Sequence, residues 1–199
     1  MQKNIIIGIL GLALIASAVL NVVLISKVAQ QEKQLKPVKA QQAAADRQKT
    51  LNQKFTRRMA QDQQKYTQEQ LRDAETLYQI ANQKWGTLEA SNSLQVMIQK
   101  YPDLDRTGCA MLYLAQMSTG DDRAKYLQDC IDKYNDCFYG DGAQVGAYAR
   151  FMLAEDYKSN GETEKAKALY DEIKAKYPDA IDHSGKLLVD IINAGSKAK

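Results

Sequence analysis

One uninterrupted apolar run stands at the start of the chain. Residues Ile5 to Ile25 carry no charged side chain, and Ser17 and Asn21 are their only clearly polar members. A helix rises by about 1.5 Å per residue, so this run would span about 30 Å, the thickness of the hydrocarbon core of a bilayer. Lys3 and Lys27 flank it. The pattern predicts that residues 1–27 form a transmembrane signal anchor.

A cleaved signal peptide is the alternative to an anchor. Ala16-Ser17-Ala18 is similar to a signal-peptidase site, and cleavage there would leave a soluble periplasmic protein. The apolar run continues past this site to Ile25, which favours an uncleaved anchor. The signals for orientation conflict, because a short basic N-terminal tail favours export of the rest whereas four lysines between residues 27 and 39 favour the cytoplasm. We expect a single-pass inner-membrane protein with its C-terminal domain in the periplasm.

Residues 28–70 are polar, basic and rich in glutamine. Residues 27–70 hold 10 Lys and Arg against 4 Asp and Glu. Pro37 should interrupt a helix here, because proline lacks an N–H group and its ring crowds the preceding turn. Beyond it, Leu51, Phe55, Met59 and Tyr66 form a stripe too thin for a coiled coil. We predict a solvated helical stalk over residues 28–70, which leaves self-association through the stalk open.

The remainder of the chain is predicted to be helical and mildly acidic. No run there alternates with a period of two, and Ala, Gln, Leu and Lys dominate the composition, which favours helix. Residues 71–199 hold 16 Lys and Arg against 20 Asp and Glu. An acidic domain speaks against nucleic-acid binding, which needs basic side chains to displace counterions from phosphates. The helix-favouring composition and the absence of alternating runs predict an all-α fold class.

A repeated tetrapeptide points to longer internal repeats. Lys100-Tyr101-Pro102-Asp103 recurs as Lys176-Tyr177-Pro178-Asp179. Before Pro178, the defining positions of a tetratricopeptide repeat (TPR) are occupied by Leu153, Ala154, Tyr157, Gly161, Ala166 and Tyr170. Residues 147–180 thus resemble a complete TPR. The small residues Ala154 and Ala166 would let the two helices of the repeat cross closely.

Residues 71–194 can be divided along the same pattern. Before Pro102, residues 71–104 resemble a second TPR, with Trp85 in place of the turn glycine. Residues 108–134 form one more helical hairpin, and Ser184 to Ile192 forms an amphipathic capping helix. The sequence thus predicts a TPR-like α-solenoid of about three hairpins plus a cap over residues 71–194, and a flexible tail over residues 195–199.

The resemblance implies that the protein binds other proteins. Anchor, stalk and repeats together resemble exported bacterial TPR scaffold proteins, which bind peptides in a concave groove lined by the first helix of each repeat. We therefore expect a membrane-tethered scaffold of the cell envelope that has no enzymatic activity and no cofactor. Carried over onto this sequence, the groove comprises Arg72, Glu75, Gln79, Asn82, Leu112, Gln116, Tyr148, Phe151, Glu155 and Lys158.

Chemistry-bearing residues are few. His183 is the only histidine, and the spacings of Cys109, Cys130 and Cys137 are not those of structural zinc sites. A metal-dependent enzyme that uses His183 and the cysteines is the rival hypothesis. If the domain is exported, one disulfide from Cys109 to Cys130 or to Cys137 is expected, because an antiparallel hairpin brings these positions together.

Overall fold

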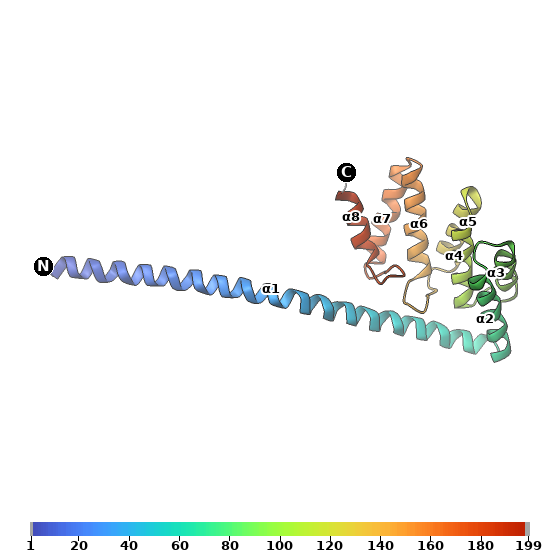
Figure 1. Ribbon diagram of the computed structural model, residues 1–199, viewed down its shortest axis with the longest axis horizontal. Helices are drawn as coiled ribbons and strands as arrows, with labels where there is room; N and C mark the ends of the chain where they lie inside the picture. Colours follow the sequence, from blue (N-terminus) through green and yellow to red (C-terminus); the bar gives the residue numbers. More distant parts are fainter. Residues whose placement is uncertain (1, 198–199) are drawn as a thin grey trace. The chain divides into compact units, whose positions relative to one another are not determined.

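The computed structural model describes the backbone of residues 2–197 and the side chains of residues 24–28 and 30–196. Within these residues the chain forms eight helices and no strand (Figure 1), so the predicted all-α class is confirmed. The helices are α1 (Gln2–Lys65), α2 (Gln68–Gln83), α3 (Leu88–Lys100), α4 (Asp105–Met117), α5 (Gly120–Lys133), α6 (Val145–Ser159), α7 (Thr163–Lys176) and α8 (Leu188–Lys197).

Helix α1 is longer than the sequence predicted. It continues through Pro37, so the prediction that this proline interrupts the helix is wrong. Proline costs about 3 kcal/mol inside a helix, and the Lys, Gln, Leu and Ala residues around it are strong helix formers that offset this cost. The chain divides into two compact units, Met1–Arg47 and Gln48–Lys199. The second unit thus begins within the predicted stalk, before residue 71.

The predicted transmembrane segment is Ile5–Ile25. The side chains of its residues 5–23 lie outside those that the structure describes. Among the residues that are described, none of the helices has the length and apolar character that crossing a membrane requires.

Six helices of the second unit pack as three successive pairs. Helices α2 and α3, α4 and α5, and α6 and α7 pack within pairs; α3 also contacts α4, α5 contacts α6, and α8 packs on α7. Thr67 starts α2 with a capping box, in which its hydroxyl accepts from the Gln70 backbone N–H and the Gln70 side chain accepts from Thr67. Ala154 and Ala166 are buried, as predicted.

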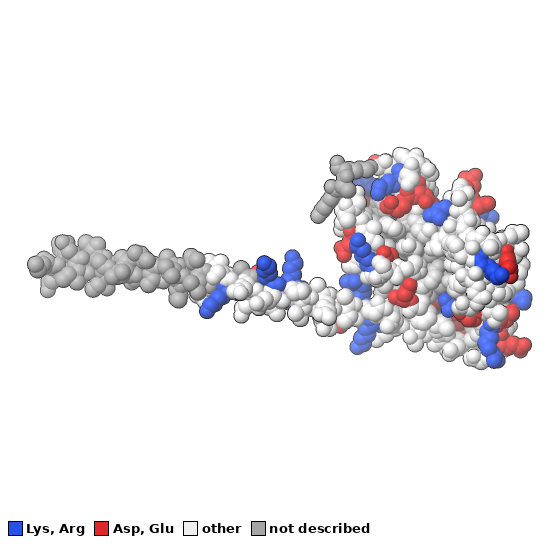
Figure 2. Space-filling view, viewed as in Figure 1, with Lys and Arg blue, Asp and Glu red and all other residues white. Residues whose placement is uncertain are grey.

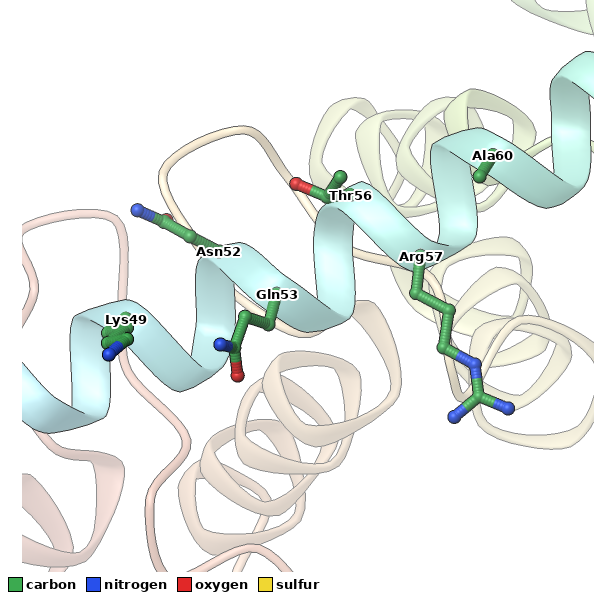
Figure 3. Close-up of a pocket in the computed structure, with 6 residues that line it drawn as sticks. All are labelled: Lys49, Asn52, Gln53, Thr56, Arg57 and Ala60. Atoms are coloured by element: carbon green, nitrogen blue, oxygen red, sulfur yellow. The ribbon is translucent and has the colours of Figure 1, made fainter.

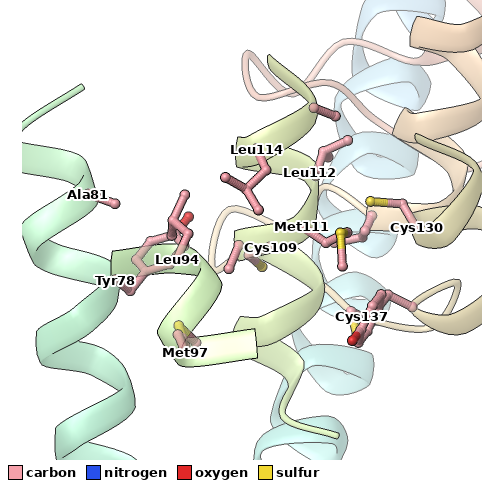
Figure 4. Close-up of a cluster of buried hydrophobic side chains, with 14 of the residues drawn as sticks. Tyr78, Ala81, Leu94, Met97, Cys109, Met111, Leu112, Leu114, Cys130 and Cys137 are labelled. Atoms are coloured by element: carbon pink, nitrogen blue, oxygen red, sulfur yellow. The ribbon is translucent and has the colours of Figure 1, made fainter. Parts of the chain in front are cut away.

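One large apolar core joins the first two pairs to α6. It contains Leu94, Met97 and Leu112 (Figure 4), together with Leu127, and each of them is fully buried. A smaller cluster around Ile173, Leu188 and Ile192 joins α6 and α7 to α8. Opposite charges are intermixed over the visible face of the second unit (Figure 2).

Two loops of the second unit share one hydrogen-bond pattern, which the sequence analysis did not detect. The first hairpin loop (residues 134–145) leads from α5 to α6, and the second (residues 177–188) leads from α7 to α8. An isolated antiparallel bridge joins Phe138 to Gln144 in the first and Ile181 to Leu187 in the second. The Val145 N–H donates to the Cys137 carbonyl at 2.9 Å, and the corresponding Leu188-to-Ala180 bond is also 2.9 Å.

The second hairpin loop corrects one predicted boundary. The sequence predicted a capping helix from Ser184, whereas α8 begins at Leu188. The reason is that the Asp182 carboxylate accepts hydrogen bonds from the Ser184 and Lys186 N–H groups at 2.9 and 2.8 Å. An Asp side chain that binds the backbone two residues on favours a turn over a helix.

The last turns of α1 pack on the hairpin loops. Leu51 is only 2 % exposed, and it clusters with Phe138 and Ile181, which occupy equivalent positions in the two loops. Phe55 and Leu187 pack against this cluster. The prediction of a solvated stalk is therefore wrong for this part of α1, because its thin apolar stripe is the docking surface for the loops.

Candidate functional site

One hollow of the second unit that includes predicted groove residues lies where α1, α2 and α4 meet. This α1–α2–α4 pocket has a volume of about 270 Å³. Its lining residues are Phe55, Met59, Asp62, Gln63, Gln68, Leu71, Arg72, Ala74, Glu75, Leu104, Asp105 and Arg106. Apolar side chains thus form walls between charged groups, the arrangement usual in ligand and peptide sites.

Charged side chains of α2 and α4 are paired at the pocket. Arg106 Nε donates to Glu75 Oε2 at 2.9 Å. The Arg106 guanidinium also lies over the Tyr78 ring, 4.6 Å from its centroid. Arg72 is exposed and forms no ion pair among those of the described residues. A partner carboxylate could therefore pair with Arg72 without displacing a carboxylate of this chain.

Asp62 links α1 to the start of α4. Helix α4 has no side-chain cap of its own, and Asp62 Oδ2 instead accepts from the Asp105 N–H at 2.9 Å. A carboxylate at a helix N-terminus binds its unpaired N–H groups and complements the helix dipole. Asp62 is 2 % exposed, so the cap is largely shielded from water.

Asp105 is a second buried carboxylate beside Asp62. Its Oδ1 accepts from the Phe138 N–H at 2.8 Å, which fixes the first hairpin loop. Burial, with a smaller contribution from the nearby Asp62 charge, raises the pKa of Asp105 to about 7 against the opposing effect of that hydrogen bond and of Arg58 and Arg106. Burial likewise raises the pKa of Asp62. The pocket therefore contains a carboxylate that exchanges its proton near neutral pH.

Arg58 balances this pair of carboxylates. Its Nη2 donates to the Asp103 carbonyl at 3.0 Å, and its Nη1 lies 3.6 Å from Asp62 Oδ1. The buried Asp62 Oδ1 and Arg58 Nε atoms form ion pairs but make no hydrogen bond. Removing one partner from such a buried pair leaves an uncompensated charge, which costs several kcal/mol.

The predicted groove residues of α2 lie together on one exposed face. Arg72 and Glu75 line the α1–α2–α4 pocket. Gln79 continues the line through a 2.7 Å hydrogen bond to Glu75, and Asn82 donates to Gln79 at 3.4 Å. These four residues thus lie in one line along α2, and their role in binding remains a prediction.

The predicted residues of the middle hairpin do not form an open surface. Leu112 is fully buried in the large core (Figure 4), so its assignment to the groove is wrong. The reason is that the first helix of this hairpin, α4, lies between α3, α5 and α6, and its apolar residues contact these helices. Gln116 is half-buried.

The predicted residues of the last repeat lie against α8. Tyr148 and Phe151 pack on the cluster that contains Leu188 and Ile192. Glu155 and Lys158 line a separate pocket of about 240 Å³ beside α8, and the Glu155 carboxylate accepts from the Tyr170 hydroxyl. The predicted groove is therefore divided between the α2 face and the contact with the capping helix.

A larger hollow, of about 650 Å³, lies along α1. All of its lining residues come from this one helix (Figure 3): Lys49, Asn52, Gln53, Thr56, Arg57 and Ala60. With side chains from one helix only, it cannot surround a ligand. We therefore take the α1–α2–α4 pocket as the candidate site, although the sequence pointed to only two of its lining residues.

The three cysteines are free thiols in the structure, so the predicted disulfide is not formed. Cys109, Cys130 and Cys137 are fully buried in the apolar core (Figure 4). Burial raises the pKa of the Cys137 thiol to about 12 and that of Cys109 well above its ordinary value. Since the thiolate is the form that attacks electrophiles and binds metals, these cysteines are chemically inert.

His183 lies in the second hairpin loop and contacts the first. Its Nδ1 is 2.8 Å from Asp141 Oδ2, and its ring meets the Tyr139 and Tyr148 rings edge-on. Among the described residues, no group of three or more His, Cys, Asp or Glu side chains could hold a metal ion. The structure thus gives His183 a role in joining the two loops.

Comparison of the chain with protein-family models, with curated proteins and with solved structures gives no match.

Proposed function

We propose that this chain is a membrane-tethered helical-repeat adaptor of the tetratricopeptide kind, which holds a partner protein in the α1–α2–α4 pocket. The observation that carries this proposal is the position of the pocket, on the face of α2 where the resemblance places peptide binding. Successive helical pairs, with contacts from α2 to α4 and from α4 to α6, support the repeat assignment. The apolar walls suit an aliphatic or aromatic side chain, and Arg72 suits a neighbouring carboxylate.

The tether in this proposal is the Ile5–Ile25 segment. Its 21 uncharged residues support a span, with Met1–Asn4 in the cytoplasm and the chain from about Lys27 outside it. A C-terminal alkaline phosphatase fusion tests the orientation, because this reporter is active only after export. An inactive fusion would mean that the orientation is the reverse, with the C-terminal domain in the cytoplasm. The intact mass of the same protein would reveal cleavage near Ala18 and favour the soluble periplasmic alternative.

Site-specific photocrosslinking tests the pocket itself. A photoreactive amino acid at Gln68, an exposed residue of α2 that lines the pocket, should form one specific adduct in membranes of the native host. The same amino acid at Gln128, an exposed position of α5, is the matched control. Met59→Glu places a charge on the apolar wall of the pocket and should reduce the Gln68 adduct at least fivefold. Equal adducts at the two positions, or an adduct unaffected by Met59→Glu, would refute the assignment.

A further inference from the structure

Exposed large apolar side chains are concentrated on one segment of α1 in the first unit. Of the eight exposed large hydrophobic residues among the described residues, five lie between residues 24 and 38. Leu24 and Ile25 end the proposed membrane span, and Val28, Leu35 and Val38 follow it. Four of these recur at steps of 4, 7 and 3: Leu24, Val28, Leu35 and Val38, which are 49–60 % exposed. These steps keep apolar residues on one stripe of a helix whose pattern repeats every 3.5 residues, the repeat of a coiled coil.

The same register accounts for the residues between and after these four. Gln31, Gln42 and Ala45 occupy the other positions of the stripe, which therefore extends over three heptads. The next positions are Lys49 and Asn52, so the stripe ends near the boundary of the first unit at Arg47. Its polar members can pair with a copy of themselves, since glutamine carries both a hydrogen-bond donor and an acceptor.

We propose that residues 24–45 of α1 pair in parallel with the same segment of a second copy of this chain. Charge complementarity supports this occupant. In a parallel pair, Lys27 flanks the seam opposite Glu32 of the second copy, which gives one pair of opposite charges on each side of the seam, while Lys39 meets the uncharged Gln34. No like charges meet at these flanking positions, which is the arrangement that favours pairing of two identical helices.

The parallel direction follows from the tether, and in this respect the inference rests on the proposed function. Two copies inserted in the same way leave the membrane side by side and pointing in the same direction. Three heptads with two glutamines in the seam would associate weakly in free solution. Confinement of both copies to one membrane raises their effective concentration and allows such a weak seam to pair.

Cysteine crosslinking of the full chain in its membrane tests this pairing. Val38→Cys places a thiol within the seam, whereas the control Lys36→Cys places one on the exposed opposite side of the same turn. The three native cysteines are buried, so the unsubstituted chain serves as the blank. On mild oxidation, Val38→Cys should give at least ten times as much disulfide-linked dimer as Lys36→Cys. Leu35→Asp added to Val38→Cys should abolish that excess.

Equal crosslinking at the two positions would mean random collision and would overturn the proposal. Absence of a Val38→Cys dimer would also overturn it, because in an antiparallel pair, or with a different partner, two copies of residue 38 do not meet. The Gln68 photoadduct is scored in the same membranes. A photoadduct without a Val38→Cys dimer would refute the pairing and leave the pocket assignment intact. A Val38→Cys dimer without the photoadduct would refute the pocket assignment and leave the pairing intact.

Discussion

The two hairpin loops have the same backbone hydrogen bonds but are held in different ways. The first has one local bond, from the Ala143 N–H to its own Asp141, and is otherwise fixed by other parts of the chain. Asp105 accepts from the Phe138 N–H, and the Tyr139 hydroxyl donates to the Cys109 carbonyl at 3.2 Å. The second is fixed largely by its own Asp182, which binds two N–H groups of the turn. One backbone conformation can thus be specified by tertiary contacts or by local ones, and these two types of loop should respond differently to substitution.

The largest expected difference between the loops is in how their contribution to folding stability depends on pH, because only the first loop is bound by a buried carboxylate. The pKa of Asp105 is about 7 in the folded chain and 3.8 in the reference state. The folded state therefore holds this proton more tightly than the unfolded state does. The contribution of protonated Asp105 to stability is greatest at low pH and is lost as pH rises from about 4 to about 7. At about 1.4 kcal/mol per pKa unit, this loss is about 4 kcal/mol.

Asp105→Asn should remove that dependence, since an amide oxygen can still accept from Phe138 but does not titrate. Urea denaturation of both proteins between pH 4 and 8 measures the effect, and the difference between them isolates Asp105 from other carboxylates. The groups around Asp105 are Asp62, Arg58, Arg106, Cys109 and Cys137. Parallel stability curves for the two proteins would show that Asp105 is ionised throughout this range.

The next largest effect is expected where the first loop meets α6. A Cβ atom at Gly146 would lie 2.6 Å from the Asn135 Cα and 2.8 Å from its carbonyl oxygen. Asn135 also accepts from Arg150 and Tyr177 at 2.7 and 2.8 Å, so it cannot shift freely. Gly146→Ala should destabilise the fold by about 3 kcal/mol through overpacking.

The equivalent position after the second loop is Val189, which is half-buried. Val189→Ala should cost about 1 kcal/mol, since it removes two partly exposed methyl groups and creates no clash. Thermal denaturation of the two variants gives the comparison. Similar losses of stability would mean that the close approach of Gly146 to Asn135 is not required for the fold.

What could be predicted from the sequence follows the same division between local and tertiary determinants. Helical spacing, the small residues Ala154 and Ala166 and the repeated Lys-Tyr-Pro-Asp motif predicted the all-α class and the helical pairs, because these signals are local. The loops share single residues 43 positions apart, such as Tyr134 with Tyr177, Asp136 with Asp179 and Gly142 with Gly185. Asn135 takes the place of Pro178, so the Lys-Tyr-Pro-Asp motif does not mark the first loop.

The candidate site was only partly predictable for the same reason. Arg72 and Glu75 could be found because the TPR pattern assigns them a face of α2. Asp62 and Asp105 could not, because a carboxylate on α1 that caps α4 is 43 residues away from its target. Phe55 and Met59 were noted as an apolar stripe, but their spacing alone does not reveal which surface they contact.

The smallest expected difference lies in the turn glycines of the two loops. Gly142 and Gly185 have φ values of +95° and +81°, a conformation in which an alanine costs about 1–2 kcal/mol. A Cβ atom at Gly142 would lie 3.1 Å from Leu51 Cβ and 3.3 Å from its Cδ1, whereas at Gly185 it would meet nothing within 4 Å. Gly142→Ala should therefore cost about 1 kcal/mol more than Gly185→Ala in urea denaturation. Leu51→Ala, which removes the Cδ1 contact, should narrow this difference. If Gly142→Ala and Gly185→Ala cost the same in the chain that keeps Leu51, α1 does not press on the first loop.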